Sequence, residues 1–216
     1  PDVYLEKLSK MLEGYKNLGV DSLGVVFGED SLFRDIRSYD ILKTVGANLI
    51  AWNMPRASQA DMLAYCRDWT DDPERYDLPY FKKLTSNEYY STLNIPIDFT
   101  HPNAAKYIKA QWGPFISQGV KGMMCDFGEL VEYDVSAYNG MSGSELHNLY
   151  AYYYTKTFNE VFSSIYPNGD FFLFSRAGSP GSQKYAATFS ADQHGDFDGL
   201  RKVVNAGIGI NASGFS

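Results

Sequence analysis

Two aspartates, Asp126 and Asp192, stand at positions in this sequence where carboxylates could do chemistry. Each follows an apolar run that is typical of a buried strand. In a parallel α/β protein the carboxyl ends of the strands face the ligand-binding crevice. We therefore expect acidic side chains at these ends to have a chemical role rather than a structural one. Cleavage of a glycosidic bond requires at least a pair of carboxylates, and the ends of two strands can supply such a pair.

Each aspartate also has a structural interpretation. Asp126 alone could be a helix cap or a surface acid, but Gly128 and Glu129 follow it. Glycine permits an unusual backbone at a strand end, and a second acid then converges on the same place. Asp192 could instead be an acid in a turn. Other aspartates follow shortly after it, so Asp192 taken alone is weak evidence for a catalytic carboxylate.

Arg176 ends a strand that lies between the two acids in sequence. A cation there would favour the ionised form of a nucleophile and hydrogen-bond sugar hydroxyls, although it could also be a plain ion pair. His101, His147 and His194 lack metal-ligand spacing, so no metal is predicted. No Gly-x-Ser-x-Gly motif is present and neither cysteine has an evident histidine partner, so a serine or cysteine hydrolase is not indicated.

The composition fits one globular domain, with 216 residues of which 44% are hydrophobic and 21% charged. The net charge of -7 and the lack of basic clusters argue against nucleic-acid or anionic-membrane partners. Aromatic residues reach 16%, which suits either a packed core or sugar binding. Cys66 and Cys125 make no disulfide framework.

No apolar window is long enough to predict a membrane span, and no leader pattern precedes the first helix. The chain begins at Pro1 and we expect it to be a piece of a longer protein. Compartment and oligomeric state are left open.

Hydrophobic periodicity predicts alternating helices and strands. Helices are expected at 3–18, 39–45, 58–69, about 102–118, 145–165 and 200–205, and strands at 20–27, 48–52, 119–125, 171–174, 185–189 and 207–210. Crossovers of a dozen residues or more favour a parallel sheet. No Gly-x-Gly-x-x-Gly follows the first strand, so a nucleotide fold is unsupported.

The pattern favours a (β/α)8 TIM barrel that is incomplete, because a whole barrel needs eight strands and about 250 residues. Residues 1–216 are therefore interpreted as a single partial catalytic domain with an irregular insertion around 70–97, where Asp71-Asp72-Pro73 breaks any period.

Several motifs in order resemble glycoside hydrolase family 31, the retaining α-glycosidases with α-glucosidase and α-xylosidase members. The motifs are Asp98-Phe99-Thr100-His101-Pro102, the run from Gly119 to Glu129, Glu145 to Tyr150, Ser175 to Gly178, Gly181 to Tyr185, and Phe189-Ser190-Ala191-Asp192-Gln193. The resemblance implies that the chain holds about strands two to seven of the family's barrel, with the outermost strands missing.

The resemblance also implies site roles. Asp126 matches the family nucleophile and Asp192 matches the general acid/base. Arg176 matches an arginine that binds the sugar next to the scissile bond, and Trp52 and Phe127 are expected by position to line that pocket. The residues flanking Asp192 depart from the family's Trp and Gly, and the family's early sugar-binding acid has no clear match here.

These roles imply hydrolysis of α-glycosidic bonds with retention, through a covalent glycosyl-enzyme, with exo action on α-glucosides or related sugars. A transglycosylase of the same family and a non-catalytic carbohydrate-binding piece are the alternatives. The predicted partner is a carbohydrate and no cofactor is expected. Truncation argues that this piece alone is inactive, and the sugar remains open among glucose, xylose, galactose, an N-acetylated sugar and sulfoquinovose.

Overall fold

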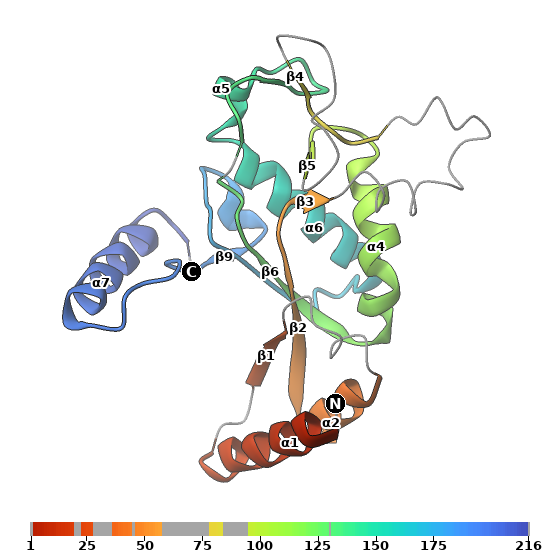
Figure 1. Ribbon diagram of the computed structural model, residues 1–216, viewed down its shortest axis with the longest axis vertical. Coiled ribbons are helices and arrows are strands. Elements are labelled where there is room, and N and C mark those ends of the chain that lie inside the picture. Colours follow the sequence, from red (N-terminus) through yellow and green to blue (C-terminus); the bar gives the residue numbers. More distant parts are fainter. Residues whose placement is uncertain are drawn as a thin grey trace.

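The computed structural model describes residues 2–19, 23–27, 36–44, 46–57, 78–83, 95–129 and 131–215. Within them, five parallel strands form a sheet in the spatial order β1-β2-β6-β8-β9 (Figure 1). Their bounds are Leu23–Phe27, Ala47–Asn53, Val120–Cys125, Phe172–Ser175 and Ala187–Thr188. Neighbours in the sheet follow one another in chain order, as in a barrel wall. The predicted α/β class with a partial barrel is confirmed.

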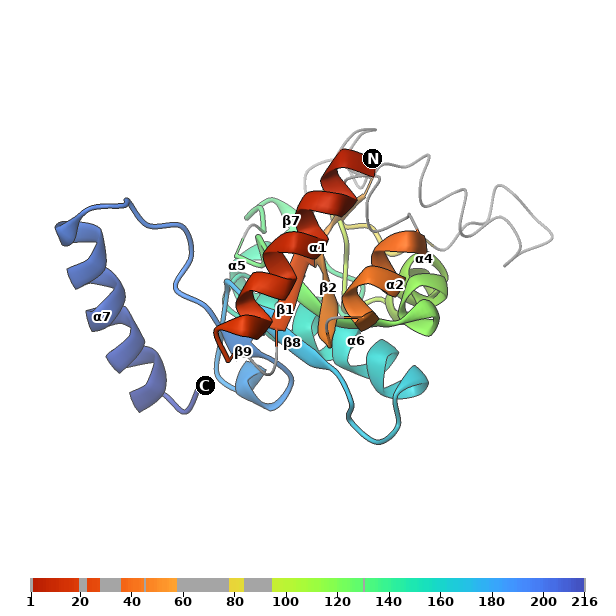
Figure 2. The ribbon, with the colours of Figure 1, turned by 90° about the horizontal axis from the view of Figure 1, so that it is seen from below.

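Helices connect and cover these strands. Their bounds are α1 Asp2–Asn17, α2 Ile36–Thr44, α4 Ala104–Gln118, α5 Gly143–Leu146, α6 Tyr150–Ile165, α7 Phe197–Ala212 and a short 3-10 helix, η2, Ser182–Lys184. Helices α4 and α6 lie on one face of the sheet, and α1 and α2 lie near the start of β1 and β2 (Figures 1 and 2).

The main core lies between the sheet and the pair α4 and α6. Tyr107, Ile108 and Ile116 of α4 are fully buried, as are Tyr154 and Phe158 of α6. The rings of Tyr154 and Phe158 meet edge to face with centroids 5.3 Å apart. Many of the aromatic residues therefore fill the core, where each ring removes a large apolar area from water.

Two small antiparallel pairs lie outside the main sheet. Strand β3, Arg56–Ala57, pairs with β5, Ile95–Pro96, and β4, Lys82–Lys83, pairs with β7, Val135–Ser136. Strands β4 and β5 fall inside the predicted irregular insertion at 70–97, so its described parts contain short strands. The rest of that insertion and the predicted helix at 58–69 lie outside the described residues.

The capping box at Ser142 and Glu145 is confirmed. Ser142 Oγ accepts the Glu145 N–H at 3.4 Å, and the Glu145 carboxylate accepts the Ser142 N–H at 2.8 Å. The single long helix predicted after this box is wrong, because α5 ends at Leu146 and α6 begins at Tyr150. The helix predicted to open around Pro102 begins at Ala104.

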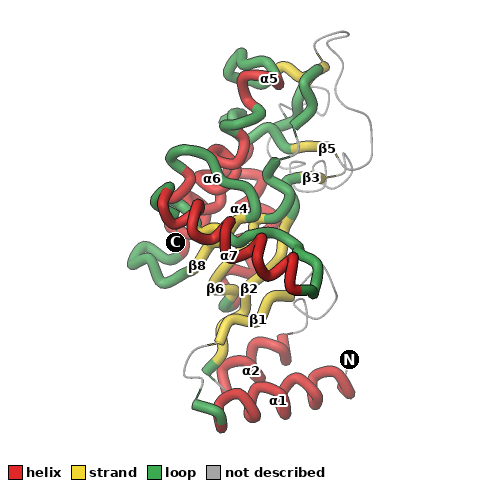
Figure 3. Tube along the Cα trace, turned by 90° about the vertical axis from the view of Figure 1, so that its left-hand side faces the viewer, coloured by secondary structure: helices red, strands yellow, loops and turns green. Residues whose placement is uncertain are grey.

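The strand predicted at 207–210 is also wrong, because these residues belong to α7. Asp196 caps this helix by accepting the Gly199 N–H at 2.7 Å. A four-residue apolar run is too short for its periodicity to separate a strand from a helix. Helix α7 lies on the side of the sheet away from α4 and α6 (Figures 1 and 3), and its apolar residues Phe197 and Ile208 are 90% and 66% exposed.

Candidate active site

The carboxyl ends of three adjacent strands stand level with one another. Cys125 at the end of β6 is paired with Asn53 of β2 on one side and with Ser175 of β8 on the other. The ladder continues one step further, since the Asp126 N–H donates to Asn53 O at 2.9 Å and the Arg176 N–H donates to Cys125 O at 3.2 Å. The sheet register thereby places Asp126 and Arg176 side by side.

The Asp126 carboxylate is buried and held from several sides. Trp52 Nε1 donates to Oδ2 at 3.0 Å, and the Phe127 backbone N–H donates to Oδ1 at 3.0 Å. Arg176 Nε lies 3.2 Å from Oδ1 as an ion pair. A charged, buried carboxylate needs such partners, because its removal from water is costly. These contacts fix the orientation of both oxygens at the strand end.

Arg176 is itself fixed by three groups. Its Nη2 donates to Glu129 Oε1 at 2.5 Å, and its guanidinium lies 4.0 Å from the centre of the Phe127 ring. The Nε–H is buried but lacks hydrogen-bond geometry towards any acceptor among the described residues, so its contact with Asp126 is electrostatic only. One N–H donor of the arginine is therefore left for another acceptor.

The turn after β6 owes its shape to Phe127 as well as to Gly128. Phe127 has a φ of 55°, in the left-handed region that costs a side-chain-bearing residue about 1–2 kcal/mol. Gly128 has an ordinary φ, but a Cβ there would come within 3.1 Å of the Tyr154 ring and 3.3 Å of Ala177 Cβ. The unusual backbone expected at Gly128 is thus at Phe127, and the glycine allows close packing instead.

Asp192 lies four residues beyond β9, in an exposed position. It lines a pocket of about 440 Å³ together with Glu129, Arg176, Ala177 and Ala191. Its side chain makes no hydrogen bond or ion pair with another described residue. The structure therefore brings Asp192 to the same pocket as Arg176, and Arg176 in turn contacts Asp126.

The five predicted site residues thus gather at one end of the sheet. Trp52 and Phe127 contact the pair of Asp126 and Arg176, and their rings meet edge to face with centroids 6.4 Å apart. Neither ring is among the residues that line the pocket with Asp192. Their predicted role as pocket walls stays a prediction.

Glu129 and Asn53 were not among the predicted site residues. Glu129 was visible as a second acid after β6, but only the fold shows that it binds Arg176. Asn53 ends β2, where its amide Nδ2 donates to Tyr154 Oη at 3.0 Å and its backbone oxygen accepts from the same hydroxyl at 2.9 Å. A polar residue at the end of a buried strand was the available signal.

The Asp98 motif has a structural place in the fold. Asp98 is fully buried and accepts the Thr100 N–H at 2.9 Å, the Thr100 hydroxyl at 2.7 Å and the Tyr138 N–H at 2.7 Å. Burial raises the pKa of this carboxyl, while the hydrogen bonds and His101 oppose the rise. Asp98 ties the loop before α4 to the loop around Tyr138.

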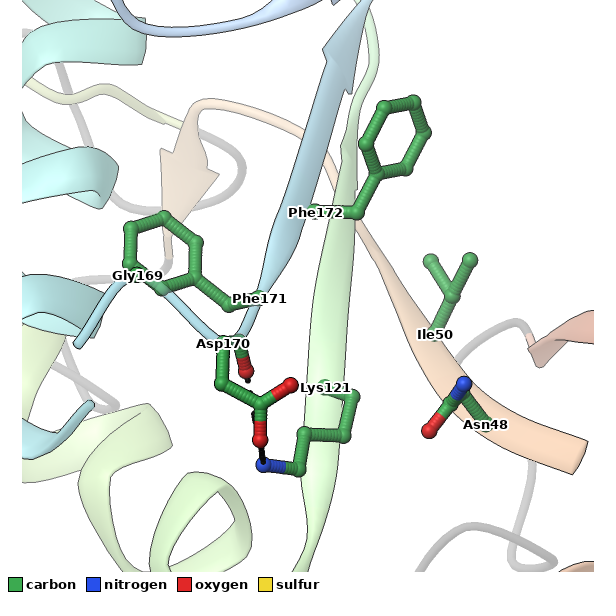
Figure 4. Close-up of a pocket in the computed structure, with 7 residues that line it drawn as sticks. All are labelled: Asn48, Ile50, Lys121, Gly169, Asp170, Phe171 and Phe172. Carbon is green, nitrogen blue, oxygen red and sulfur yellow. Dashed lines mark hydrogen bonds and ion pairs between the residues drawn. The ribbon is translucent and has the colours of Figure 1, made fainter. Parts of the chain in front are cut away.

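A different pocket, of about 340 Å³, opens at the opposite end of the strands (Figure 4). It is lined by Asn48, Ile50, Lys121, Gly169, Asp170, Phe171 and Phe172. Lys121 and Asp170 pair with each other there, and Lys121 also lies 4.0 Å from the centre of the Tyr166 ring. Its charges are mutually satisfied, and it lies away from the predicted site residues.

Among the described residues, no group of three or more His, Cys, Asp or Glu side chains could hold a metal ion. Within the same residues, no helix is long and apolar enough to cross a membrane. Cys125 is buried next to Asp126, and desolvation raises the pKa of its thiol, as suits an apolar filler.

Comparison with known proteins shows that the chain is similar to curated proteins that are named after sugars. The chain is 34% identical over 123 residues to a sulfoquinovosidase of Escherichia coli and 25% identical over 120 residues to an alpha-xylosidase of Emericella nidulans. Each alignment covers 55% of this chain, and 18% and 15% of the respective relative. The chain therefore spans less than a fifth of these curated relatives.

Solved structures share the fold. The cycloalternan-forming enzyme of Listeria monocytogenes, in complex with a pentasaccharide substrate, aligns with a TM-score of 0.76 at 22% identity, over 94% of this chain and 23% of that one. A family 31 sulfoquinovosidase from E. rectale aligns with a TM-score of 0.60 at 22% identity, over 75% and 24%. Residues 33–216 match the family model described as the glycosyl hydrolases family 31 TIM-barrel domain. The chain therefore belongs to glycosyl hydrolase family 31 and carries part of its TIM-barrel domain.

Proposed function

We propose that the full-length protein hydrolyses α-glycosidic bonds with retention of configuration, releasing single sugars from the non-reducing end. Asp126 is the nucleophile that attacks the anomeric carbon, and Asp192 is the acid that protonates the leaving oxygen. Water then attacks the glycosyl-enzyme while Asp192 acts as the base. Arg176 holds the nucleophile and the sugar.

One observation carries this proposal above the others. Asp126 is oriented by Trp52 and paired with Arg176 at the carboxyl end of the sheet, and Arg176 shares a pocket with Asp192. The burial of Asp126 suits a nucleophile that must be aimed, and the exposure of Asp192 suits a group that exchanges protons with water. Arg176 lines the pocket that contains Asp192, so its guanidinium is placed to bind a substrate hydroxyl.

The sugar is proposed to be α-glucose or a related pyranose. The similarity to sulfoquinovosidases and to an alpha-xylosidase makes α-sulfoquinovosides and α-xylosides the first alternatives to test beside α-glucosides. A panel of p-nitrophenyl α-glycosides of these three sugars, assayed with the full-length protein, identifies the sugar by the highest kcat/KM.

The test of mechanism uses the best substrate of that panel. The first product released should have the α configuration by NMR, and Asp126→Ala should abolish turnover. A β product released first would exclude retention, and unchanged turnover in Asp126→Ala would exclude the nucleophile. Asp170→Asn is the matched control, because Asp170 is an exposed acid at the opposite end of the strands and pairs with Lys121.

A further inference from the structure

Left-handed backbone conformations outside glycine occur beside the two proposed catalytic aspartates. Within the described part of the chain, Phe127 and Ala191 are the residues other than glycine with a positive φ, at 55° and 58°. Phe127 directly follows Asp126, and Ala191 directly precedes Asp192. A left-handed backbone is unfavourable for a residue with a Cβ, and it persists only where the surrounding structure imposes it. Ala191 therefore marks a conformation that the fold imposes beside the proposed acid.

The two carboxylates are held in different ways. Asp126 is oriented through its side chain, by Trp52 and Arg176. The Asp192 side chain is exposed and makes no hydrogen bond or ion pair within the described part of the chain. The backbone sets the direction in which a side chain leaves the chain, and it also limits the rotamers that the side chain can adopt. The direction of the Asp192 carboxyl group thus depends on the backbone of its loop.

The loop between β9 and α7 is anchored at both ends. At its start, the Phe189 N–H donates to Ser175 O at 3.1 Å, which continues the sheet by one step. At its end, the His194 carbonyl oxygen packs against Gly199 in the first turn of α7, where a Cβ would come within 2.1 Å of that oxygen. Residues 190–193 therefore have to turn between two fixed points.

A side-chain hydrogen bond closes this turn. Gln193 Nε2 donates to Ser190 O at 2.8 Å and so spans Ala191 and Asp192. Ala191 and Asp192 both line the pocket of about 440 Å³ that Arg176 also lines. The left-handed residue and the hydrogen bond thus shape the short segment that brings the proposed acid to the pocket.

We propose that Ala191 and Gln193 are positioning residues that aim the Asp192 carboxyl group into the pocket of Arg176. The inference rests on the proposed function, because it assigns both residues to the acid and base steps of Asp192. The left-handed backbone of Ala191 sets the direction of the carboxyl group, and the hydrogen bond from Gln193 keeps the turn closed. Both residues act through Asp192 rather than on the reacting atoms.

The test changes the backbone preference at position 191 of the full-length protein. Valine is β-branched and strongly disfavours a left-handed backbone, whereas glycine adopts it readily. Ala191→Val should lower kcat/KM by about 10- to 100-fold on the phenyl α-glycoside of the preferred sugar, because that leaving group needs an acid and a misplacement of about 1 Å has effects of this size. On the dinitrophenyl α-glycoside, whose leaving group departs without an acid, kcat/KM should stay within about threefold of the wild type. Ala191→Gly should retain most of the activity on the phenyl glycoside.

Two further measurements separate positioning from a structural defect. The kcat of Ala191→Val on the dinitrophenyl glycoside should fall, because Asp192 is also the base for the attack of water. Azide, a nucleophile that needs no base, should restore this kcat. Gln193→Met, which keeps the side-chain length but lacks the amide donor, should lower kcat/KM on the phenyl glycoside alone by about 3- to 10-fold, the effect of losing one hydrogen bond.

Ala206→Val is the matched control, because it makes the same exchange at an exposed alanine within α7. It should leave both substrates unaffected. Equal losses of kcat/KM on both glycosides, wild-type activity in Ala191→Val, a loss in Ala191→Gly as large as in Ala191→Val, or no rescue by azide would each overturn the positioning role alone. A wild type that cleaves no α-glycoside, or losses in Asp192→Ala that do not depend on the leaving group, would overturn the proposed function itself.

Discussion

Replacing Trp52 with phenylalanine removes one N–H donor from the proposed nucleophile while keeping most of the aromatic ring. In the structure Trp52 Nε1 donates to Asp126 Oδ2 at 3.0 Å, and the carboxylate is buried. A hydrogen bond to a charged group contributes about 1.5–3 kcal/mol. At about 1.4 kcal/mol for each tenfold change in rate, Trp52→Phe should lower kcat/KM by about 10- to 100-fold.

The assay measures kcat/KM of the full-length protein on the preferred aryl α-glycoside, together with thermal unfolding. Trp112→Phe is the matched control, because Trp112 Nε1 donates to the neutral Asn53 Oδ1 at 3.2 Å. That variant should lose stability and keep kcat/KM within about threefold of the wild type. If kcat/KM of Trp52→Phe also stays within about threefold of the wild type, the hydrogen bond from Trp52 to Asp126 contributes less than about 0.7 kcal/mol to catalysis. That result would show that the hydrogen bond does not orient a nucleophile.

Three further predictions concern acid catalysis, packing and pH. Asp192→Ala should slow glycosides with poor leaving groups by at least about 100-fold and dinitrophenyl glycosides much less, and equal losses would count against the acid role. Gly122→Ala should destabilise the fold by about 3 kcal/mol in denaturant titrations, because its Cβ would lie 2.4 Å from Phe172 O. Gly113→Ala should be tolerated, because its Cβ would make only ordinary contacts with the side chains of Lys109 at 3.5 Å and Ile165 at 4.0 Å. Burial raises the pKa of Asp98, so the contribution of Asp98 to stability is present below about pH 3.8 and is lost as the pH rises through the raised pKa. Asp98→Asn should therefore flatten the pH dependence of the unfolding free energy in this pH range. Curves of unfolding free energy against pH that run parallel for the wild type and the variant would contradict this prediction.

Local patterns predicted the elements that carry the site. The apolar run that ends at Asp126 was recognisable as a buried strand, and β6 spans Val120–Cys125. The capping box was equally local, because its two partners, Ser142 and Glu145, are only three positions apart. Predictions failed where local signals were ambiguous, as in the apolar run at 207–210, which the cap at Asp196 places inside α7.

The sequence by itself determined that Asp126 and Arg176 directly follow strands, because strand periodicity and the residues that come after it are local properties. Only the tertiary structure decided which of these side chains meet. Asp126 and Arg176 are fifty positions apart, and it is the register of β6 against β8 that sets them in contact. The pairing with Glu129 and the left-handed turn at Phe127 depend on the same packing. Contacts between distant segments form only when the whole sheet and its helices assemble, so no local pattern encodes them.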